Sequence, residues 1–533
     1  MQVILKNVKV EDKMTSLKTR TALAIILALS LVASLAGVVM ADWPTDPSTN
    51  TPVVTAANNQ GAHRIIADGS GGFFAVWQDC RNGESCKSGG GIYAQRFDAD
   101  GNRLWTINGV PVCTDSNNQT SPRICLDGSG GCIISWVDCR GDSDTYIYAQ
   151  RLNGEGIAQW ANNGVMVSQS LPDKDQLCPW LVSDGQGGAI ISWRDISGGV
   201  YLQRLSSSGS MLWGGYVQIS GTGNEWGQKL IPDGQGGAII TWVDLRGLTD
   251  RDIYIQRVDS SGNELWGISD VVVCNATDDQ FCPRIIPAGD GAIVIWWDNS
   301  HDQIFAQKVN GAGTAQWTNN GVCVFSGSYV PYTHGIASDG ADGAIITWAD
   351  DADDNVYARR IGSSGNLMWG IPTQITNTGD FNDISHSPRK TVEDGAGGAI
   401  TVWMNDDFEI YAQRVDGTGS ALWTENGVLL CDAETTTEGG RGCPRLVACD
   451  TNCGATGALA YWRDSRNKSS DIYMQGIDPE GNLGKPCPEC FSPPVGGKAY
   501  PVNKVDLVMP MIVLGIAALA GASLVWQRRR YAS

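Results

Sequence analysis

Histidine is scarce in this chain of 533 residues: only His63, His301, His334 and His386 occur. They are too scattered to suggest a metal cluster. Basic residues are also outnumbered, because 38 Lys and Arg stand against 57 Asp and Glu, for a formal net charge of −19. Such acidity keeps an exposed protein soluble and argues against a nucleic-acid partner.

Motifs of catalysis are also lacking. The chain has no Gly-x-Ser-x-Gly elbow and no glycine loop of the kind that cradles phosphate, since its Gly-Gln-Gly-Gly runs recur as turns. No segment of useful length has helical periodicity. Paired carboxylates near a channel could hydrolyse glycosides. The candidate aspartates recur in almost every repeat, however, whereas a catalytic residue is normally singular, so catalysis has little support.

Tryptophan is abundant and regularly spaced. Eight of the 20 tryptophans recur at steps of 49 to 59 residues: Trp77, Trp136, Trp193, Trp242, Trp296, Trp348, Trp403 and Trp462. A fixed period of this size indicates one supersecondary unit copied in a row. Seven more, from Trp105 to Trp423, follow at a second fixed place in each unit. These rings are expected to pack the repeats together.

Each unit reads as four short strands. In the fourth copy, an apolar run ends at Pro232, the turn 233–237 follows, and strands are expected at 238–243, at 252–258 and around Trp266. The fold class is therefore all-β, an eight-bladed β-propeller over residues 42–484. Pro52 to Ala56 resembles the end of the first copy and is expected to supply the outer strand of the last blade, which closes the ring. A linear solenoid is the alternative.

The repeat resembles the WD-like repeats of the periplasmic Tol-system propeller. The shared residues are Pro232-Asp233-Gly234, Arg246 and Asp252-Ile253-Tyr254. The resemblance covers about 430 residues and implies the propeller fold. The Gln-Arg pair after the tyrosine and the second tryptophan depart from that family's pattern.

Both ends of the chain are apolar. Residues 1–41 are expected to be a signal peptide cleaved after Ala41, with an uncleaved anchor as the alternative. Residues 507–526 are long enough to be a transmembrane helix. The arginines of the tail 527–533 place the C-terminus in the cytoplasm, which puts the propeller outside the cell on an extracellular tether, 485–506. This C-terminal region resembles the membrane anchor of archaeal surface proteins.

Sixteen cysteines fit an oxidising compartment. Near neighbours in sequence are the expected disulfide partners: Cys80–Cys86, Cys274–Cys282, Cys431–Cys443 and Cys449–Cys453. The spacing leaves open how Cys113, Cys125, Cys132, Cys139, Cys178 and Cys323 are connected. Asn118, Asn275 and Asn467 begin glycosylation sequons and are expected on the surface.

Two sets of charges recur near the face of the ring with the most variable loops. Aspartates end the second strand of most copies (Asp79, Asp138, Asp244 and Asp298), and basic residues occur in the first strand (Arg64, Arg123, Lys229, Arg284 and Arg445). The two sets either pair with each other, or the aspartates cap turns, or both form a polar mouth of the central channel for an oligosaccharide or peptide. Trp180 interrupts the basic set, and an exposed indole there would stack on sugars.

No cofactor is expected, although the acidic loop with Asp350, Asp351, Asp353 and Asp354 is a possible calcium site. The resulting hypothesis is a membrane-anchored extracellular propeller that acts as a binding, adhesion or envelope-scaffolding module. Its partner would be an extracellular glycan or protein. The alternative is an extracellular carbohydrate-active enzyme, a glycoside hydrolase or lyase, on the same fold.

Overall fold

The computed structural model describes residues 43–486, except 84–88, 141–143, 169–174, 197, 221–224, 247–249, 268–269, 301, 328–333, 351, 378–390, 406, 433–441 and 450–456. The expected signal peptide, transmembrane segment and cytoplasmic tail lie outside these residues, as does nearly all of the tether. Within the described part of the chain, no helix has both the length and the apolar character needed to span a bilayer.

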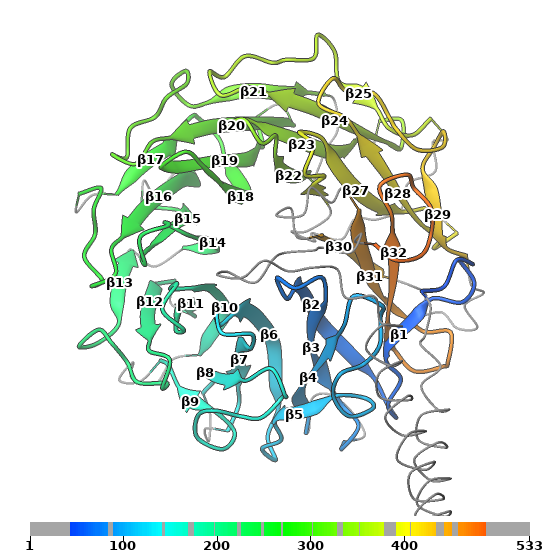
Figure 1. The fold of residues 1–533 in the computed structure, drawn as a ribbon. Helices are drawn as coiled ribbons and strands as arrows, with labels where there is room; N and C mark the ends of the chain where they lie inside the picture. The colour runs from blue at the N-terminus through cyan, green and yellow to red at the C-terminus, as the bar shows by residue number, and fades with distance from the viewer. Residues whose placement is uncertain are drawn as a thin grey trace, which may run out of the picture. The chain divides into compact units, whose positions relative to one another are not determined.

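The described strands form eight four-stranded antiparallel sheets in a ring (Figure 1), which confirms the predicted eight-bladed propeller. The innermost strands of the blades are β2 (Gln60–Ala67), β6 (Gln119–Leu126), β10 (Gln176–Ser183), β14 (Trp226–Pro232), β18 (Gln280–Ala288), β22 (His334–Ser338), β26 (Thr391–Glu393) and β30 (Gly442–Ala448). The second strands are β3 (Phe73–Asp79), β7 (Cys132–Asp138), β11 (Ala189–Asp195), β15 (Ala238–Asp244), β19 (Gly291–Asp298), β23 (Ala344–Asp350), β27 (Ala399–Met404) and β31 (Ala458–Asp464).

The third strands are β4 (Gly91–Phe97), β8 (Tyr146–Leu152), β12 (Val200–Leu205), β16 (Asp252–Val258), β20 (Gln303–Val309), β24 (Asn355–Ile361), β28 (Ile410–Val415) and β32 (Asp471–Ile477). The outermost strands are β5 (Val110–Cys113), β9 (Val165–Met166), β13 (Val217–Ser220), β17 (Val271–Cys274), β21 (Val322–Ser326), β25 (Thr373–Gln374), β29 (Val428–Cys431) and β1 (Thr51–Val54). The outer tryptophans, such as Trp266, precede these strands rather than beginning them.

The second strand of each blade is buried on both faces, because blades pack on either side of it. All seven residues of β15 are buried, and Trp242 stacks on Tyr254 of β16 with ring centroids 6.2 Å apart. Two buried aromatic rings in contact contribute more than their area alone would. The turn before β5 approaches the equivalent indole so closely that a Cβ on Gly109 would lie 2.5 Å from Trp77, and its φ is +83°. Only glycine fits both conditions.

The Gln-Arg pair of the third strand stabilises its own blade, and its arginine also reaches a carbonyl of the next blade. Gln256 accepts a hydrogen bond from the backbone of Trp266 at 3.0 Å and donates to the Gly267 carbonyl at 2.8 Å. Arg257 pairs with Asp233, in the turn between β14 and β15, at 3.0 Å. The indole of Trp266 donates to Gly311 of the next blade at 2.9 Å. Equivalent ion pairs occur in other blades: Arg96–Asp68, Arg151–Asp127, Arg204–Asp184, Arg360–Asp339 and Arg414–Asp394.

The ring closes through the N-terminal segment, as predicted. Strand β1 pairs antiparallel with β32, so the first and last strands share one blade. That blade lacks a tryptophan of its own after β32, and Trp43 supplies the indole, which donates to the Ala99 carbonyl at 2.9 Å. Asn50 reaches the Leu430 carbonyl at 2.7 Å, across 380 residues of sequence. The repeat pattern predicts the closing strand but not the role of Trp43, which lies ahead of the repeats.

Candidate binding site

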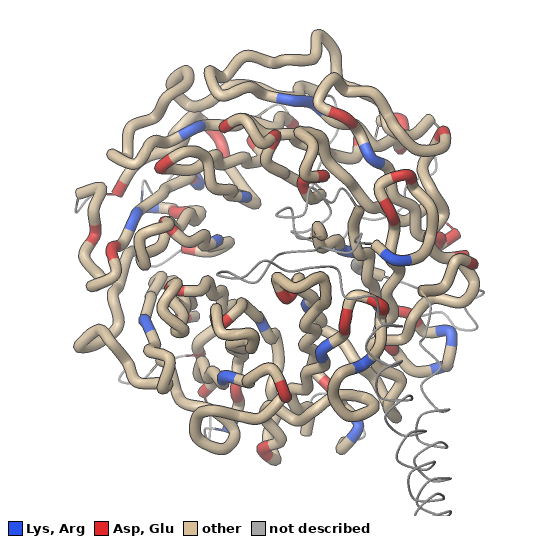
Figure 2. Tube along the Cα trace, in the orientation of Figure 1, with Lys and Arg blue, Asp and Glu red and all other residues tan. Residues whose placement is uncertain are grey.

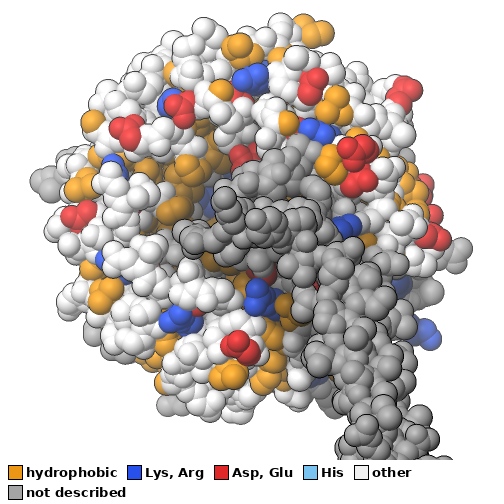
Figure 3. Space-filling view, in the orientation of Figure 1, with side chains coloured by type: hydrophobic (Ala, Val, Ile, Leu, Met, Phe, Trp, Pro, Cys, Tyr) orange, Lys and Arg blue, Asp and Glu red, His pale blue; other side chains and the backbone are white. Residues whose placement is uncertain are grey.

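Two cavities lie among the innermost strands, and hydrophobic side chains are visible on the wall of the hollow that Figure 3 shows inside the ring. The larger, about 330 Å³, has mostly apolar walls that include Ile66, Ile231, Ile286 and Val447. The smaller, about 230 Å³, is here called the basic cavity. It is lined by Arg64, Arg123, Cys178, Trp180, Gly227, Gln228, Lys229, Arg284 and Arg445. Trp180, Lys229 and Arg284 line both cavities.

A bulge in the innermost strands precedes the cations of the basic cavity. The pairing register shifts just before Arg284, and Cys282, two residues earlier, has φ +53°. The same shift precedes Arg64, Arg123, Trp180, Lys229 and Arg445. A β-bulge re-aims the side chains that follow it. Lys and Arg positions accordingly lie on several innermost strands around the centre (Figure 2), within the strands rather than at a mouth formed by loops.

Backbone carbonyls accept hydrogen bonds from three of these cations. Arg64 Nη1 donates to the His63 carbonyl at 2.6 Å, and Arg123 Nη1 donates to the Pro122 carbonyl at 3.0 Å. Lys229 Nζ donates to the Gly227 and Gln228 carbonyls at 3.0 and 3.1 Å. A carbonyl satisfies a donor but carries no net charge, so these bonds leave the positive charge of the cavity in place.

Carboxylates are missing from the described wall of the basic cavity. Arg284 is only 7% exposed, and its Nε has no hydrogen-bond partner among the described residues. Neither Arg284 nor Lys229 forms an ion pair with a described carboxylate. Burial, together with the positive charges of Arg284 and Arg123, lowers the pKa of Lys229 to about 7. The cavity is therefore a site of concentrated positive charge.

Trp180 occupies the basic position of the third blade and is half-buried. The Arg123 guanidinium and the Lys229 ammonium, one from each neighbouring blade, both lie 4.8 Å from its ring centroid. Such cation–π contacts are attractive because the face of the ring carries partial negative charge. The expected openly exposed indole is therefore not what the structure shows: Trp180 holds two cations in place.

Two buried histidines stand one residue before the cation position. His63 is 4% exposed, and neither ring nitrogen has a hydrogen-bond partner among the described residues. Burial and the charges of Arg445, Arg64 and Arg463 lower the pKa of His63 well below its usual range, which keeps the ring neutral. His334 Nε2 lies 2.9 Å from the Cys282 carbonyl of the adjacent blade. Neither histidine was predicted as a site residue, because the four histidines are scattered in sequence.

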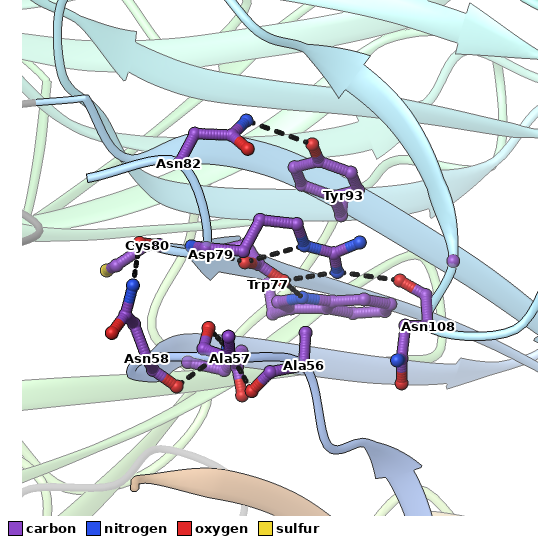
Figure 4. Close-up of polar contacts among 12 residues, drawn as sticks. Ala56, Ala57, Asn58, Trp77, Asp79, Cys80, Asn82, Tyr93 and Asn108 are labelled. Carbon is purple, nitrogen blue, oxygen red and sulfur yellow. Dashed lines mark hydrogen bonds and ion pairs between the residues drawn. The ribbon is translucent and has the colours of Figure 1, made fainter.

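The aspartates of the second strand lie away from the described cavity walls. Trp77 Nε1 donates to Asp79 at 2.7 Å, Arg81 pairs with the same carboxylate at 2.5 Å, and the guanidinium covers the ring of Tyr93 (Figure 4). The same cluster recurs as Asp138–Arg140, Asp244–Arg246 and Asp464–Arg466. Asp298 instead accepts from Ser300 and Gln280.

Turn capping is confirmed as the role of these aspartates, since the backbone N–H of Arg81 donates to Asp79 at 2.9 Å. Asp79, Asp138, Asp244 and Asp298 line neither of the two described cavities, so their part in a polar mouth of the channel stays a prediction. All four carboxylates are buried within the blades. Asp79, Asp138 and Asp244 each accept from a tryptophan N–H and pair with an arginine.

The acidic loop considered for calcium is engaged internally. Asp350 accepts a hydrogen bond from the backbone N–H of Ala352 at 3.0 Å, and Asp353 accepts from the hydroxyl of Tyr357 at 2.6 Å. Asp354 is exposed, and Asp351 lies outside the described residues. The described part of the chain gathers no three metal-ligating side chains at one place.

Two of the four expected disulfides are not formed, because Cys274, Cys282 and Cys431 are not disulfide-bonded. Cys431 instead faces the neighbouring blade, where Arg466 donates to its sulfur at 3.1 Å. Cys113 has the same contact with Arg140, at 3.2 Å. Cys113 and Cys431, each at the end of an outermost strand, therefore pack between blades. Closeness in sequence was not a reliable guide to the disulfide partners.

Cys80 and Cys449 are disulfide-bonded. The pairings expected for them, with Cys86 and Cys453, involve residues outside the described part of the chain and stay predictions. Among the sequons, Asn275 and Asn467 are exposed and Asn118 is half-buried. Glycosylation at these residues likewise stays a prediction.

No protein-family model matches the chain, and no curated protein matches it. The resemblance to Tol-system repeats therefore stays an expectation. Similar solved structures include the BP39L lectin from Burkholderia pseudomallei, with 11% identity over 70% of this chain and 99% of the lectin at a TM-score of 0.42. An oligogalacturonate lyase in complex with manganese shows 10% identity over 80% of this chain and 98% of the lyase at 0.39.

The dipeptidyl peptidase 4 of Porphyromonas gingivalis shows 8% identity over 82% of this chain at a TM-score of 0.43, and this chain spans 60% of the peptidase's length. The chain similarly spans 54% of a puromycin hydrolase. These similarities are too distant to bear on function, and the assignment of the fold rests on the strands themselves.

Proposed function

We propose that the protein is a cell-surface binding module, anchored by its C-terminal apolar segment, that takes an extracellular glycan or a segment of a protein into the central channel of its propeller. The observation that supports this function is the pair of adjoining cavities at the ring centre, one apolar and one basic. Concave sites with apolar walls and a few polar groups are typical of ligand binding.

The arrangement of carboxylates favours binding over catalysis. Acid–base hydrolysis of a glycoside needs two carboxyl groups beside the bond that breaks. The described cavity walls contain none, and the recurrent Asp79, Asp138 and Asp244 are engaged with Trp and Arg side chains. A carbohydrate-active enzyme is the competing function.

A channel-filling variant tests the binding function. Ile286→Trp places an indole in the apolar cavity, and Leu265→Trp makes the same type of change at a side chain that is 47% exposed and lines neither cavity. The full chain in detergent is applied to a glycan array and a peptide array. We expect Ile286→Trp to weaken any ligand found by tenfold or more, and Leu265→Trp to leave it within twofold. Equal binding by all three proteins would rule out the channel.

The same ligands distinguish binding from turnover. Ligand recovered unchanged after prolonged incubation supports a binding module. Release of product that stops when one non-repeated carboxylate is replaced would establish the enzyme instead.

Location is tested on intact cells. A membrane-impermeant amine reagent is expected to label the propeller, while an epitope placed after Ser533 is expected to stay inaccessible to antibody until the cells are permeabilised. Labelling of both without permeabilisation, or of neither, would contradict the proposed topology.

A further inference from the structure

We infer that the basic cavity is an oxyanion site, which binds a carboxylate, sulfate or phosphate group of the ligand between Arg284 and Lys229. The inference rests on the proposed function in placing the ligand in the channel, and it adds the chemical class that the ligand must carry.

The wall of the basic cavity is rich in positive charge. Five of the nine lining residues are Arg or Lys, and none is Asp or Glu, in a chain whose formal net charge is −19. Gathering cations in a partly desolvated space costs free energy through repulsion and lost hydration. Elsewhere in the blades, arginines such as Arg140, Arg246 and Arg257 have an aspartate beside them. An external anion in the cavity would supply the countercharge that Arg284 and Lys229 lack among the described residues.

Donor groups are ready for such an anion. Arg284 is only 7% exposed, and its Nε is a donor that has no hydrogen-bond partner among the described residues. Lys229 is held beside it by Trp180 and by the carbonyls of Gly227 and Gln228. Hydrogen bonds from a guanidinium to an oxyanion are stronger than those to a neutral acceptor. Trp180 therefore acts as a positioning residue, which keeps Arg123 and Lys229 in place while the site is empty.

The space suits a group of this size. The basic cavity has a volume of about 230 Å³. This is several times the volume that one water molecule occupies in the liquid, ~30 Å³. It can hold an oxyanion together with the first atoms of the molecule that carries it. The rest of the ligand can extend along the apolar cavity, which shares Trp180, Lys229 and Arg284.

Calorimetric titration of the full chain with sulfate tests the inference, with phosphate and glucuronate as further probes and glucose as the neutral match for glucuronate. We expect saturable binding of one sulfate per chain and at least tenfold weaker binding by Arg284→Gln. The control Arg251→Gln removes the same charge from an ion pair outside the cavity and should bind sulfate within twofold of the unaltered chain. Equal sulfate affinity of all three proteins would overturn the site.

A second measurement needs no substitution in the cavity. Mild acylation followed by peptide mapping reports the reactivity of each lysine. We expect sulfate to protect Lys229 at least fivefold and to leave the exposed Lys468 unchanged. Equal acylation of Lys229 with and without saturating sulfate would overturn the inference even if Arg284→Gln failed to fold.

The outcomes separate this inference from the proposed function. If neutral ligands bind in a manner blocked by Ile286→Trp while sulfate and glucuronate do not bind, the binding function holds and the oxyanion site is wrong. If sulfate binds and depends on Arg284 but Ile286→Trp leaves every array ligand unaffected, the oxyanion site holds and the larger channel function is wrong. Binding of glucose as tight as that of glucuronate would also contradict the oxyanion site.

Discussion

Arginine and lysine occur in two contrasting settings in this propeller. Between the blades, Arg246 shares its charge with Asp244 at 2.6 Å and Asp270 at 2.9 Å, and it covers the ring of Tyr254. At the centre of the ring, Arg284 is more deeply buried than Arg246, and neither Arg284 nor Lys229 has an ion pair with a described carboxylate. The two settings therefore differ in countercharge: Arg246 has two aspartates beside it, whereas Arg284 and Lys229 have none among the described residues.

The contrast shows that a buried cation is informative only together with its partners. Burial alone would raise the pKa of Asp244, but hydrogen bonds from Arg246 and Trp242 and the charge of Arg246 hold that pKa below its ordinary value. Lys229 shifts for the opposite reason, because burial and like charges act on it in the same direction. The pairing of Asp244 with Arg246 stabilises the fold. The repulsion and burial at Lys229 destabilise its charged form, and a bound anion would offset that cost.

Breaking a paired site should have the largest effect on stability. Asp244→Ala leaves Arg246 and the Trp242 indole without their shared acceptor, so we expect the free energy of unfolding to fall by ~3 kcal/mol. Urea denaturation followed by tryptophan fluorescence measures it. Asp259→Ala, in an exposed turn, is the control and should cost less than 1 kcal/mol. A similar loss in both variants would show that the cluster is no more than surface pairing.

The pH dependence of stability should distinguish Lys229. Its pKa of about 7 in the folded protein is below the usual value of a lysine, so between pH ~7 and ~10 the unfolded chain holds more protons at this residue. Stability should therefore rise with pH by up to ~1.4 kcal/mol per unit over this range. Its charged and titratable neighbours are Arg284 and Cys282 on β18, Arg123 on β6 and Cys178 on β10.

Denaturation of the unaltered chain and of Lys229→Met across this pH range isolates the contribution of Lys229. The difference between the two proteins should vary with pH, whereas Lys468→Met, at an exposed lysine, should run parallel to the unaltered chain. A constant difference for Lys229→Met would mean that this lysine is fully solvated.

Removing a buried charge that has no carboxylate partner should stabilise the protein, whereas removing a paired charge should destabilise it. Arg284→Met replaces a buried guanidinium without a carboxylate partner by an apolar side chain, and we expect a gain of about 1 kcal/mol in the absence of anions. Thermal and urea unfolding in a chloride-poor buffer would measure it. A loss of stability of about 2 kcal/mol or more would show that Arg284 stabilises the fold as the aspartate-paired arginines do. The difference between the two settings would then not hold.

The exposed pair Arg251–Asp279 should have the smallest effect. Its side chains are 38% and 26% exposed, and Arg251→Gln should change stability by less than ~0.5 kcal/mol, because solvent and salt screen such pairs. Repeating the measurement at high salt should abolish the remaining difference. An effect as large as that of Asp244→Ala would show that exposure does not separate the two classes of ion pair.

The sequence could predict the fold because the signals repeat. The tryptophan of the second strand recurs in all eight copies, and the Asp two residues after it and the Asp-Gly turn before the strand recur in most of them, so each copy checks the others. Single features were harder to predict. Trp43 stands alone ahead of the repeats, and nothing in its neighbours says that it contacts Ala99. Cys274 and Cys282 lie eight residues apart but belong to different blades.

The site was predicted only in part. The basic positions from Arg64 to Arg445 were recognised as a set because they recur in register, and five of them line one cavity. Their separation from the aspartates was not predictable, because a one-residue bulge at positions such as Ala62 and Cys178 changes which side chains face the channel. No sequence pattern reliably predicts a positive φ at a non-glycine residue.

Closure of the ring by β1 has a consequence for biosynthesis. The pairing of β1 with β32, in which Thr51 lies opposite Met474, joins residues made at opposite ends of translation. At ~5–20 residues per second, the first strand waits on the order of tens of seconds before its partner is made. During that interval seven blades can assemble beside an open seam, whose unsatisfied strand edge could pair with another nascent chain. A helper that shields residues 43–54 until release of the finished polypeptide would therefore raise the yield of monomeric rings.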